Sequence, residues 1–478
     1  MLYNYKYTLF GLVILIGFSG CATTSSQNDT KLKVQPIQAY ETSKTFESER
    51  TIKWPSKYWW ESYKDKQLND LIEEGIKNSP DIALVRARVK EASTYIQATN
   101  ATLLPSLGVN ASTSTKKLSY NYTYPKNSMP KSWNDYGRVG LDLNWEIDFW
   151  GKNRAALASA TSRYNAMLAE KAQAKLLLSS AIATSYAHLV QLYALKDIAS
   201  LTLNVKEKIK SLMEERYKGG LDNMVKFHQA QKEYMQLLEE IKTIEESISL
   251  NKNQIAALIG KGPDRGLKIH KPSVSIKEGY ALPKQLTLNL LGRRPDIVAA
   301  KELVKSQLSY IQYQKAKFYP NVNLSAMIGL QSLGLNNLTN SGSDIGEVGP
   351  AIYLPIFTDK LLEAQVKEAR AGYEEKVSLY NAAVVHALKD VSEVGIQQRS
   401  LVFQIQTVRQ SLRAVDNIYK IQNNRYKQGL SNLIDLLFAQ ENVYSVQKNL
   451  ITLKTQSFIL DIAMKRALGG GYNIEENN

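Results

Sequence analysis

The sequence has 478 residues, of which 44% are hydrophobic, and it carries a formal net charge of +15 with a pI near 9.4. A chain of this length and composition can bury a sizeable core and form two or three ordinary domains. Its basic residues are interspersed with acidic ones along helical stretches, as in Lys206-Glu207-Lys208, which is typical of a solvated helix face and argues against a nucleic-acid partner. The single cysteine excludes an intrachain disulfide and a cysteine metal site.

Residues 1–20 predict an export signal peptide, because Lys6 precedes a short apolar run from Leu9 to Phe18. The small residues that follow, together with Cys21, resemble a bacterial lipobox, in which Phe18 replaces the usual aliphatic residue. We therefore predict lipid attachment, including palmitate, at Cys21; an ordinary signal beside an unrelated cysteine is the alternative. By the same resemblance, Ala22 predicts sorting to the outer membrane, since lipoproteins kept at the inner membrane usually have Asp there. Residues 21–53 are rich in Ser, Thr, Gln and Lys and predict a lipid-anchored tether.

The rest of the chain contains one module twice. Asn78-Ser79-Pro80-Asp81 returns as Arg293-Arg294-Pro295-Asp296, 215 residues later, and residues 215–221 return as residues 424–430, 209 residues later. In each copy a helical pattern is followed by an alternating pattern and then by a very long helical pattern. We therefore predict an internal duplication.

The two repeats are expected to have the same order of elements. We predict a first repeat over residues 54–265 and a second over residues 291–468, with a Gly- and Pro-containing linker at 266–290 between them and a C-terminal tail at 469–478. The predicted elements are strands at about 106–116 and 138–149, helices at about 151–218 and 222–259, strands at about 321–331 and 347–357, and helices at about 359–428 and 431–468.

The alternating segments predict strands with one wet face. From Leu141 to Phe149 apolar and polar residues alternate strictly, which places Asp142, Glu146 and Asp148 together on the polar face. We predict that these acids line a water-filled lumen. Four strands of about ten residues in each chain match the length of tilted transmembrane strands.

Four strands alone cannot close a barrel, and open strand edges are not tolerated in lipid. Two chains would supply eight strands with an interior filled by side chains, whereas three would supply twelve strands around a lumen. After the export signal no stretch of 18 apolar residues occurs, so strands would have to cross the bilayer. A soluble sheet with one wet face is the alternative that the alternation leaves open.

The long helical segments favour an elongated tube or stalk over a compact domain. From Lys152 to Lys218 there is neither Gly nor Pro, so 67 residues can form one helix of about 100 Å. The second copy is similarly long, and both contain coiled-coil seams with an apolar residue about every 3.5 positions. At their far ends, Gly219-Gly220 and Gly429 predict helical hairpin turns, with Asp222 or Ser431 capping the return helix.

No catalytic constellation is present in the sequence. The four histidines are far apart and form no metal-binding pair, so we predict no metal site. Gly469-Gly470-Gly471 lacks the Lys-Ser/Thr of a phosphate-binding loop and is explained by a helix C-cap. We therefore predict that the protein is not an enzyme and has no cofactor.

Several runs together resemble the TolC-like outer-membrane factor family, in particular the lipoprotein branch of its efflux proteins, which serves RND-type efflux. The most specific are Trp145-Glu146-Ile147-Asp148-Phe149-Trp150-Gly151 and Arg293-Arg294-Pro295-Asp296-Ile297. Weaker matches span nearly the whole mature chain: Trp59-Trp60, Leu282-Pro283, Phe318-Tyr319-Pro320, Leu354-Pro355-Ile356-Phe357 and Ala467-Leu468-Gly469-Gly470-Gly471.

The resemblance implies a mainly α-helical protein with a membrane β-barrel. It implies a homotrimer in which a twelve-stranded barrel, with four strands from each chain, continues into an α-helical periplasmic tunnel. The implied function is a passive exit duct for drugs and toxic compounds, anchored by lipid in the outer membrane and extending into the periplasm. The implied partners are outer-membrane lipid, a periplasmic adaptor (membrane fusion protein) and an inner-membrane pump.

The resemblance also assigns residues to two sites at the hairpin end. The turns that would contact the adaptor contain Gly219, Gly220, Leu221, Gly429 and Leu430. The periplasmic gate is expected at Asp435, with Ile434 or Phe438 as an apolar constriction; Phe438 stands where members of the family often have a second acid.

Two other functions stay open at this point. A duct for type I protein secretion shares the implied fold, although the lipobox and the Arg-Arg-Pro-Asp-Ile run favour efflux. A non-channel periplasmic coiled-coil lipoprotein or adaptor would explain Cys21 and the coiled-coil seams, but not four alternating segments with aromatic ends such as Trp145 and Trp150.

Overall fold

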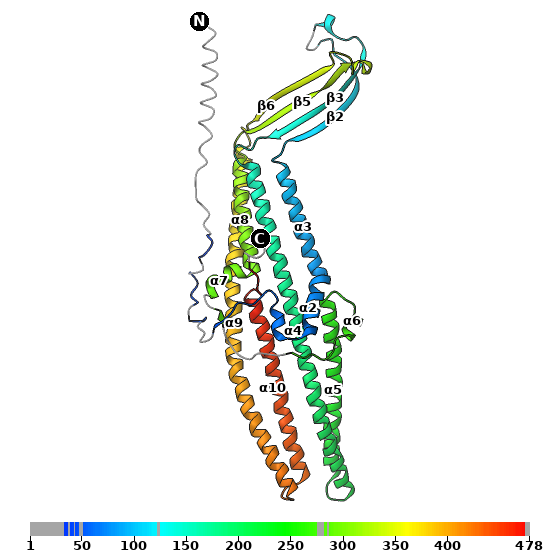
Figure 1. Ribbon diagram of the computed structural model, residues 1–478, viewed down its shortest axis with the longest axis vertical. Helices are drawn as coiled ribbons and strands as arrows, with labels where there is room; N and C mark the ends of the chain where they lie inside the picture. Colours follow the sequence, from blue (N-terminus) through cyan, green and yellow to red (C-terminus); the bar gives the residue numbers. More distant parts are fainter. Residues whose placement is uncertain are drawn as a thin grey trace.

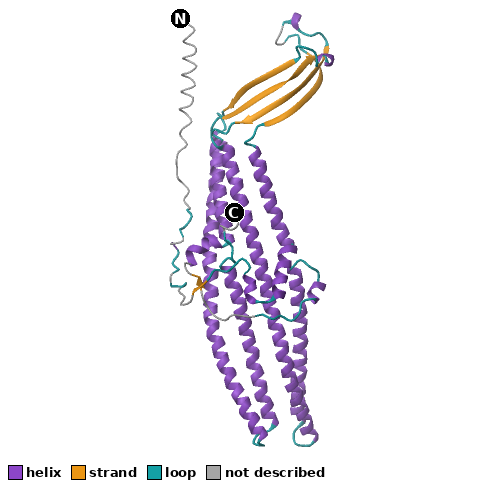
Figure 2. Cartoon of the chain, viewed as in Figure 1, coloured by secondary structure: helices purple, strands orange, loops and turns teal. Residues whose placement is uncertain are grey.

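The computed structural model describes residues 33–36, 39–42, 44–46, 51–121, 125–274, 282–283 and 286–473. Long helices run side by side in an elongated body, with a four-stranded sheet at one end and two helical hairpin turns at the other (Figure 1). Figure 2 shows that helix extends over the whole length of this body. Within the described residues, no helix combines the length and the apolar character needed to cross a bilayer.

The first repeat supplies one half of this architecture. Its elements are the 3₁₀ helix η2 (Trp59–Tyr63), α2 (Lys66–Asn78), α3 (Pro80–Ala101), β2 (Ser106–Lys117), β3 (Trp133–Glu146), α4 (Lys152–Lys218), α5 (Met224–Leu258) and the short α6 (Asp264–Leu267). The second repeat supplies α7 (Leu286–Arg293), α8 (Pro295–Ala316), β5 (Asn321–Leu333), β6 (Asp344–Tyr353), α9 (Asp359–Lys427) and α10 (Leu433–Ala467). A two-residue strand before the first repeat, β1 (Thr51–Ile52), pairs in parallel with β4 (Leu282–Pro283) before the second.

The sheet has the order β2-β3-β5-β6, and every neighbouring pair is antiparallel. The β3–β5 pair joins the two repeats, so each repeat contributes one hairpin to a continuous sheet. Pro80 and Pro295 begin α3 and α8, where the missing N–H of proline removes no helical hydrogen bond.

Two predicted strand ends are wrong. The strand predicted to reach Phe149 ends at Glu146, because Asp148 instead accepts hydrogen bonds from the backbone N–H groups of Asn153 (3.2 Å) and Arg154 (2.9 Å) at the start of α4. The otherwise unsatisfied N–H groups of a helix N-terminus make such a carboxylate favourable. The strand predicted to reach Phe357 ends at Tyr353, shortly before Pro355, which cannot donate to a strand ladder.

The long helix α4 contacts α3 and α8 toward the sheet, and α5 and α10 toward the hairpin turns. In the same way, α9 contacts α8 and then α10. The long helices α4 and α9 therefore run through the whole bundle. The shorter helices α3 and α8 pack on them near the sheet, and α5 and α10 pack on them near the hairpin turns. The largest apolar cluster lies where these two groups of shorter helices meet and includes Trp59, Leu71, Tyr186 and Phe458.

Two glycines at equivalent positions of the repeats allow the end of each return helix to approach the backbone just before α3 or α8. Gly260 follows α5 with φ of +74°, and a Cβ there would lie 2.7 Å from the carbonyl oxygen of Asn78. Gly469 follows α10 with φ of +86°, and a Cβ there would overlap the carbonyl oxygen of Arg293. Only glycine combines the left-handed conformation with so close an approach of two backbones.

The segment before the first repeat lies along α9. The backbone N–H of Gln35 donates to the side-chain oxygen of Asn381 (3.1 Å), and the Asn381 amide donates to the carbonyl of Lys33 (3.3 Å). Tyr40 packs against the cluster that contains Val377 and Tyr380. This segment is thus tied to the outermost long helix of the second repeat.

Candidate functional site

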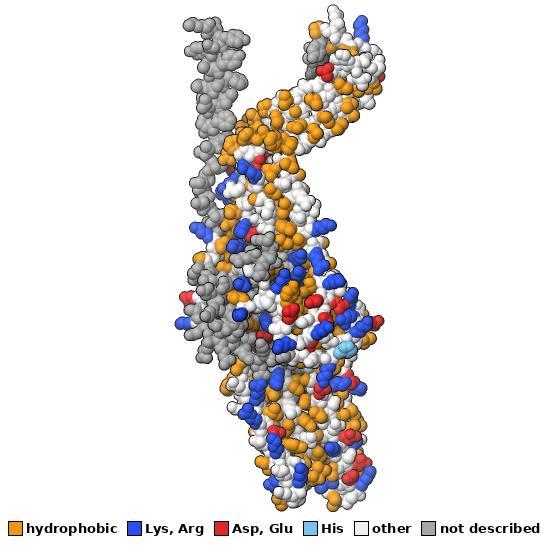
Figure 3. Space-filling view, viewed as in Figure 1, with side chains coloured by type: hydrophobic (Ala, Val, Ile, Leu, Met, Phe, Trp, Pro, Cys, Tyr) orange, Lys and Arg blue, Asp and Glu red, His pale blue; other side chains and the backbone are white. Residues whose placement is uncertain are grey.

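The sheet has one continuous apolar face, because apolar residues pair directly across its strands. Val109 pairs with Leu141, and Leu141 pairs with Ile328, so the three share one face. Their exposed fractions are 72%, 40% and 62%, although apolar side chains of this size are usually covered. Figure 3 shows hydrophobic side chains over the sheet and most charged side chains on the helical body. An apolar surface of this kind needs lipid or protein as a neighbour.

The opposite face of the sheet is polar. Asp142 accepts a hydrogen bond from the side-chain amide of Asn110, and a Glu146 oxygen lies 2.5 Å from the ammonium of Lys152. Both acids therefore lie on the polar face, as the alternation predicts. Asp148 does not belong to this face, since it caps α4. The predicted set of three strand acids is corrected to two.

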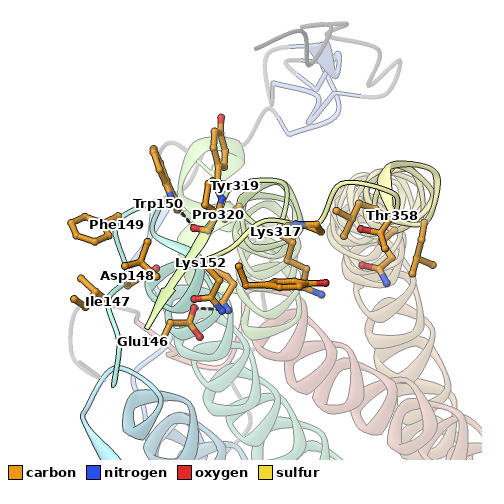
Figure 4. A pocket seen from close by; sticks show the side chains of 18 residues that line it. Glu146, Ile147, Asp148, Phe149, Trp150, Lys152, Lys317, Tyr319, Pro320 and Thr358 are labelled. Carbon is orange, nitrogen blue, oxygen red and sulfur yellow. Dashed lines mark hydrogen bonds and ion pairs between the residues drawn. The ribbon is translucent and has the colours of Figure 1, made fainter. Parts of the chain in front are cut away.

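A cavity of about 360 Å³ lies where the sheet joins the helices (Figure 4). On its wall, the Trp150 indole stacks on Tyr319 with ring centroids 4.8 Å apart and donates to the carbonyl of Pro320 at 2.9 Å. The cavity is also lined by the Glu146–Lys152 ion pair. Two runs singled out in the sequence, one ending β3 and one preceding β5, thus contact each other and fix the sheet on the bundle.

The opposite end of the molecule consists of the two hairpin turns. In the first, the N–H of Leu221 donates to the carbonyl of Arg216 (2.8 Å) and that of Gly220 to Tyr217 (3.0 Å). This is the Schellman arrangement, which requires a left-handed residue at Gly220, where φ is +70°. Gly219 has φ of −80°, so its conformation does not require glycine.

The second turn repeats this geometry. The N–H of Leu430 donates to the carbonyl of Arg425 (2.8 Å), and Gly429 has φ of +74°. Leu221 and Leu430 follow the left-handed glycines and are 72% and 64% exposed. Each hairpin therefore ends in an exposed leucine.

The residues that cap the return helices differ from the prediction. Asn223 accepts from the N–H of Lys226 (3.1 Å), and Asn432 accepts from the N–H of Asp435 (2.9 Å). The predicted cap Asp222 instead binds Arg216 at 3.1 Å and Lys226 at 3.0 Å. Hydrogen bonds from Lys226 and Arg216 lower the pKa of this carboxyl. The other predicted cap, Ser431, donates to Asp435 at 3.3 Å.

The three predicted gate residues lie in the first two turns of α10, at neighbouring positions on the helix. Asp435 is exposed and Phe438 is 47% exposed, and their spacing places them on one side of the helix. Ile434 packs against the cluster of Val205 and Leu437 within the chain. The three residues are therefore neighbours on α10, and Ile434 differs from the other two only in packing against the chain's own core.

Lys206 of α4 is a residue that the sequence analysis did not single out. Its ammonium lies 2.8 Å from Glu233 of α5 and 2.7 Å from Glu441 of α10. Sequence spacing gives no sign of this contact, because the three residues come from three separate helices. Lys206 thereby joins both hairpins.

Arg294 joins three helices in the middle of the bundle. Its guanidinium binds Asp296 with two hydrogen bonds (3.1 and 2.7 Å), Asp390 of α9 at 3.0 Å and the carbonyl of Ala467 at 3.2 Å. Burial works against its charge, but the hydrogen bonds and attraction of the two aspartates outweigh burial and raise the pKa of Arg294. In the Arg-Arg-Pro-Asp run, Arg294 therefore holds α8, α9 and α10 together.

Two further predictions concern lipid and metal. Cys21 and the predicted signal peptide lie outside the described residues. In the part of the chain that the structure describes, no group of His, Cys, Asp or Glu side chains is arranged to hold a metal ion.

Residues 71–261 and 286–470 match the family model of outer membrane efflux proteins. The chain belongs to this family. The two matched segments correspond to most of residues 54–265 and to residues 291–468, in that order. This outer membrane efflux protein is a duct, and the predicted family and efflux function are confirmed.

Similar proteins of known name support the same conclusion. The chain is 30% identical to the fusaric acid resistance protein FusA of Burkholderia cepacia over 76% of this chain and 68% of that protein. It is 26% identical to the multidrug resistance outer membrane protein MdtP of Escherichia coli K12, over 88% of this chain and 87% of that protein.

The structure is also similar to that of a solved outer-membrane protein. It superposes on VceC of Vibrio cholerae with a TM-score of 0.80 and 39% identity, covering 88% of this chain and 100% of VceC. The predicted fold class, mainly helical with four membrane strands per chain, is therefore confirmed, and so is the location in the outer membrane.

Proposed function

We propose that three copies of this efflux protein form the exit duct of a tripartite efflux system for small molecules. The observation that carries the proposal is the open sheet with one apolar and one polar face at the end of a bundle about 100 Å long. With its apolar face toward lipid, three such sheets closed into one barrel would leave the polar faces around water. The bundle would continue this lumen into the periplasm as a helical tunnel.

The polar wall of the barrel would then carry charges of both signs, because the strand register places Lys116, Arg138 and Glu347 on the same face as Asp142. Asp142, Glu146 and Glu347 are the acids of this face, so three chains would bring nine carboxylates to the inner wall. Asn110 and Lys152 hold the first two of these acids in place and partly offset their charge. Relatives named for multidrug and fusaric acid resistance favour small-molecule efflux over type I protein secretion.

The hairpin end would be both the docking surface and the gate. Leu221 and Leu430 present apolar side chains for a periplasmic adaptor, which in turn would connect the duct to an inner-membrane pump. Asp435 and Phe438 would line the closing end, where three carboxylates repel one another and attract cations, and the phenylalanines narrow the pore. Ile434 would support this ring from behind through its packing within the chain.

Lipid anchoring at Cys21 fits the position of the segment along α9. A rise of about 1.5 Å per residue places Asn381 about 33 Å from the start of α9, which follows the sheet directly. Lys33 is bound at Asn381, and the stretch from Cys21 to Lys33 can extend to about 40 Å. A lipid on Cys21 could therefore reach the level at which the sheet begins.

Single-channel recording in planar bilayers tests the duct. The purified protein is expected to form discrete pores, and Asp142→Asn with Glu146→Gln should lower their permeability to cations relative to anions. A protein that inserts no pore at any concentration would contradict the proposal.

Intact-mass measurement tests the anchor separately. The protein isolated from membranes should carry the mass of attached acyl chains, and Cys21→Ala should remove it. An unmodified wild-type protein would show that Cys21 is not a lipidation site without affecting the duct.

A further inference from the structure

A second cavity, of about 730 Å³, lies in the middle of the bundle, far from the sheet and from the hairpin turns. Its walls are the segment before and within η2, the second half of α2, the start of α3, the first half of α4 and the turn after α10. Its volume is within the range of roughly 300–1,000 Å³ that is typical of small-molecule sites. The duct function uses none of its side chains.

Five cationic side chains and a single acid line this cavity. The cations are Lys57, Lys77, Arg86, Lys171 and Lys175, and the acid is Glu73. Ion pairs nearby involve other groups, such as Arg265 with Glu74 and Lys465 with Asp461. Within the described residues, none of the four lysines forms an ion pair with a carboxylate.

The positive charges are close enough to affect one another. Partial burial and repulsion by Lys171, Lys57 and Arg86 lower the pKa of Lys175. Lys57, Lys77 and Arg86 are exposed and screened by water, whereas Lys171 and Lys175 are partly buried, so the repulsion that an anion would relieve is felt most at these two.

A buried hydrogen-bond donor on the cavity wall has no acceptor. Trp60 is 5% exposed and is held edge-on by Trp59 and Tyr58, with ring centroids 5.7 Å apart in each case. Its indole N–H has no hydrogen-bond partner in the described structure. Leaving a buried donor unpaired is costly, and native structures generally satisfy such groups. The cavity lining therefore supplies positive charges and few acceptors, while the Trp60 N–H itself is buried within the wall.

We propose that this cavity, lined by Lys57, Lys77, Arg86, Lys171, Lys175 and Trp60, binds a multivalent anion that carries phosphate or carboxylate groups. Oxyanions supply several acceptors at once, and ammonium and guanidinium groups form their strongest hydrogen bonds with them. The bound anion would tie α2 and α3 to α4 and to the turn after α10. The proposal is independent of the duct, because it concerns a separate site.

The experiment uses the purified full-length protein with pyrophosphate and citrate as probes. Thermal unfolding and isothermal titration calorimetry are measured for each probe against sodium chloride at the same ionic strength. A saturable rise in the unfolding midpoint with pyrophosphate alone identifies a phosphate site, and one with citrate alone identifies a carboxylate site. A saturable rise in the unfolding midpoint with both probes indicates that the site recognises multivalent negative charge rather than one chemical group. No saturable binding of either probe would overturn the proposal.

The matched variants separate a binding site from ordinary structural lysines. Lys171→Gln with Lys175→Gln should weaken probe binding at least tenfold and raise the unfolding midpoint without probe, because repulsion is relieved. Lys90→Gln with Lys261→Gln changes the charge equally at exposed lysines outside the cavity and should leave binding unchanged. Equal binding by the cavity variant and its control would contradict the assignment.

Discussion

The ammonium group of Lys206 in α4 lies 2.7 Å from a carboxylate oxygen of Glu441 in α10, so an ion pair joins the first helical hairpin to the second. The same ammonium lies 2.8 Å from Glu233 of α5. The Lys206 side chain is only 12% exposed, so solvent screens these pairs less than it screens pairs on an open surface. The second copy has Val415 at the corresponding position and lacks such a contact.

Lys206→Met should loosen the two hairpins, because methionine keeps the aliphatic chain but leaves Glu233 and Glu441 without their cation. We expect a loss of about 1–2 kcal/mol of stability in thermal unfolding, together with a higher single-channel conductance. Lys208→Met, at an exposed position one residue beyond Glu207, is the matched control. Wild-type conductance in Lys206→Met would show that this contact does not hold the hairpins together.

The same contact predicts a dependence of stability on pH. Burial opposes the charge on Lys206, but its hydrogen bonds to Glu233 and Glu441 outweigh burial and raise its pKa, while the hydrogen bond from Lys206 lowers the pKa of Glu233. A raised lysine pKa contributes stability below its unfolded value of about 10.4, and a lowered glutamate pKa contributes stability above its unfolded value of about 4.3.

The difference in unfolding midpoint between wild type and Lys206→Met should therefore be constant from about pH 5 to pH 10. It should shrink as the pH falls through the lowered pKa of Glu233 or rises through the raised pKa of Lys206. A difference that persists unchanged at the acidic end would mean that packing rather than charge accounts for it.

Asp435→Ala is expected to raise the conductance of the resting pore roughly twofold, because the shorter side chains widen the opening. It should also reduce the cation preference, since the ring of carboxylates is removed. Asp416→Ala removes an equal charge from α9, where Asp416 pairs with Lys420, and should change neither quantity. Phe438→Ala should widen the pore while leaving its ion preference intact. If Asp435→Ala and Asp416→Ala behave alike, the gate assignment fails.

Gly469→Ala should be strongly destabilising. The substitution places a side chain at φ of +86° and against the carbonyl of Arg293, and left-handed backbone alone costs about 1–2 kcal/mol for a residue with a Cβ. We expect a total loss of more than about 2 kcal/mol in chemical or thermal unfolding. Gly262→Ala, where a Cβ would meet nothing within 4 Å, should change stability by less than about 0.5 kcal/mol.

Local signals were sufficient to predict the long helices and the turns. The absence of Gly and Pro from Lys152 to Lys218 leaves no interruption in α4, and left-handed glycines mark both turns. The two faces of the sheet also follow from a period of two that continues across every strand pair.

The predicted N-cap was wrong where two neighbouring residues could both cap the same helix. Asp222 and Asn223 can both cap a helix, and the choice fell to Asn223 because Arg216 and Lys226 bind the aspartate. The alternation in β3 likewise gave no sign that Asp148 would bind the start of α4. Contacts such as Lys206 with Glu441 lie outside any sequence pattern, since they depend on how three separate helices are placed.

The return helices α5 and α10 each contain 35 residues, and each ends at a glycine that contacts the backbone in the middle of the bundle. Both turns therefore lie about 52 Å beyond these contacts, at nearly the same height. A protein that docks on this end would meet a level rim rather than alternating high and low positions. It could distinguish the two hairpins only by their chemistry, for which Lys226 in one and Asp435 at the corresponding place in the other provide opposite charges.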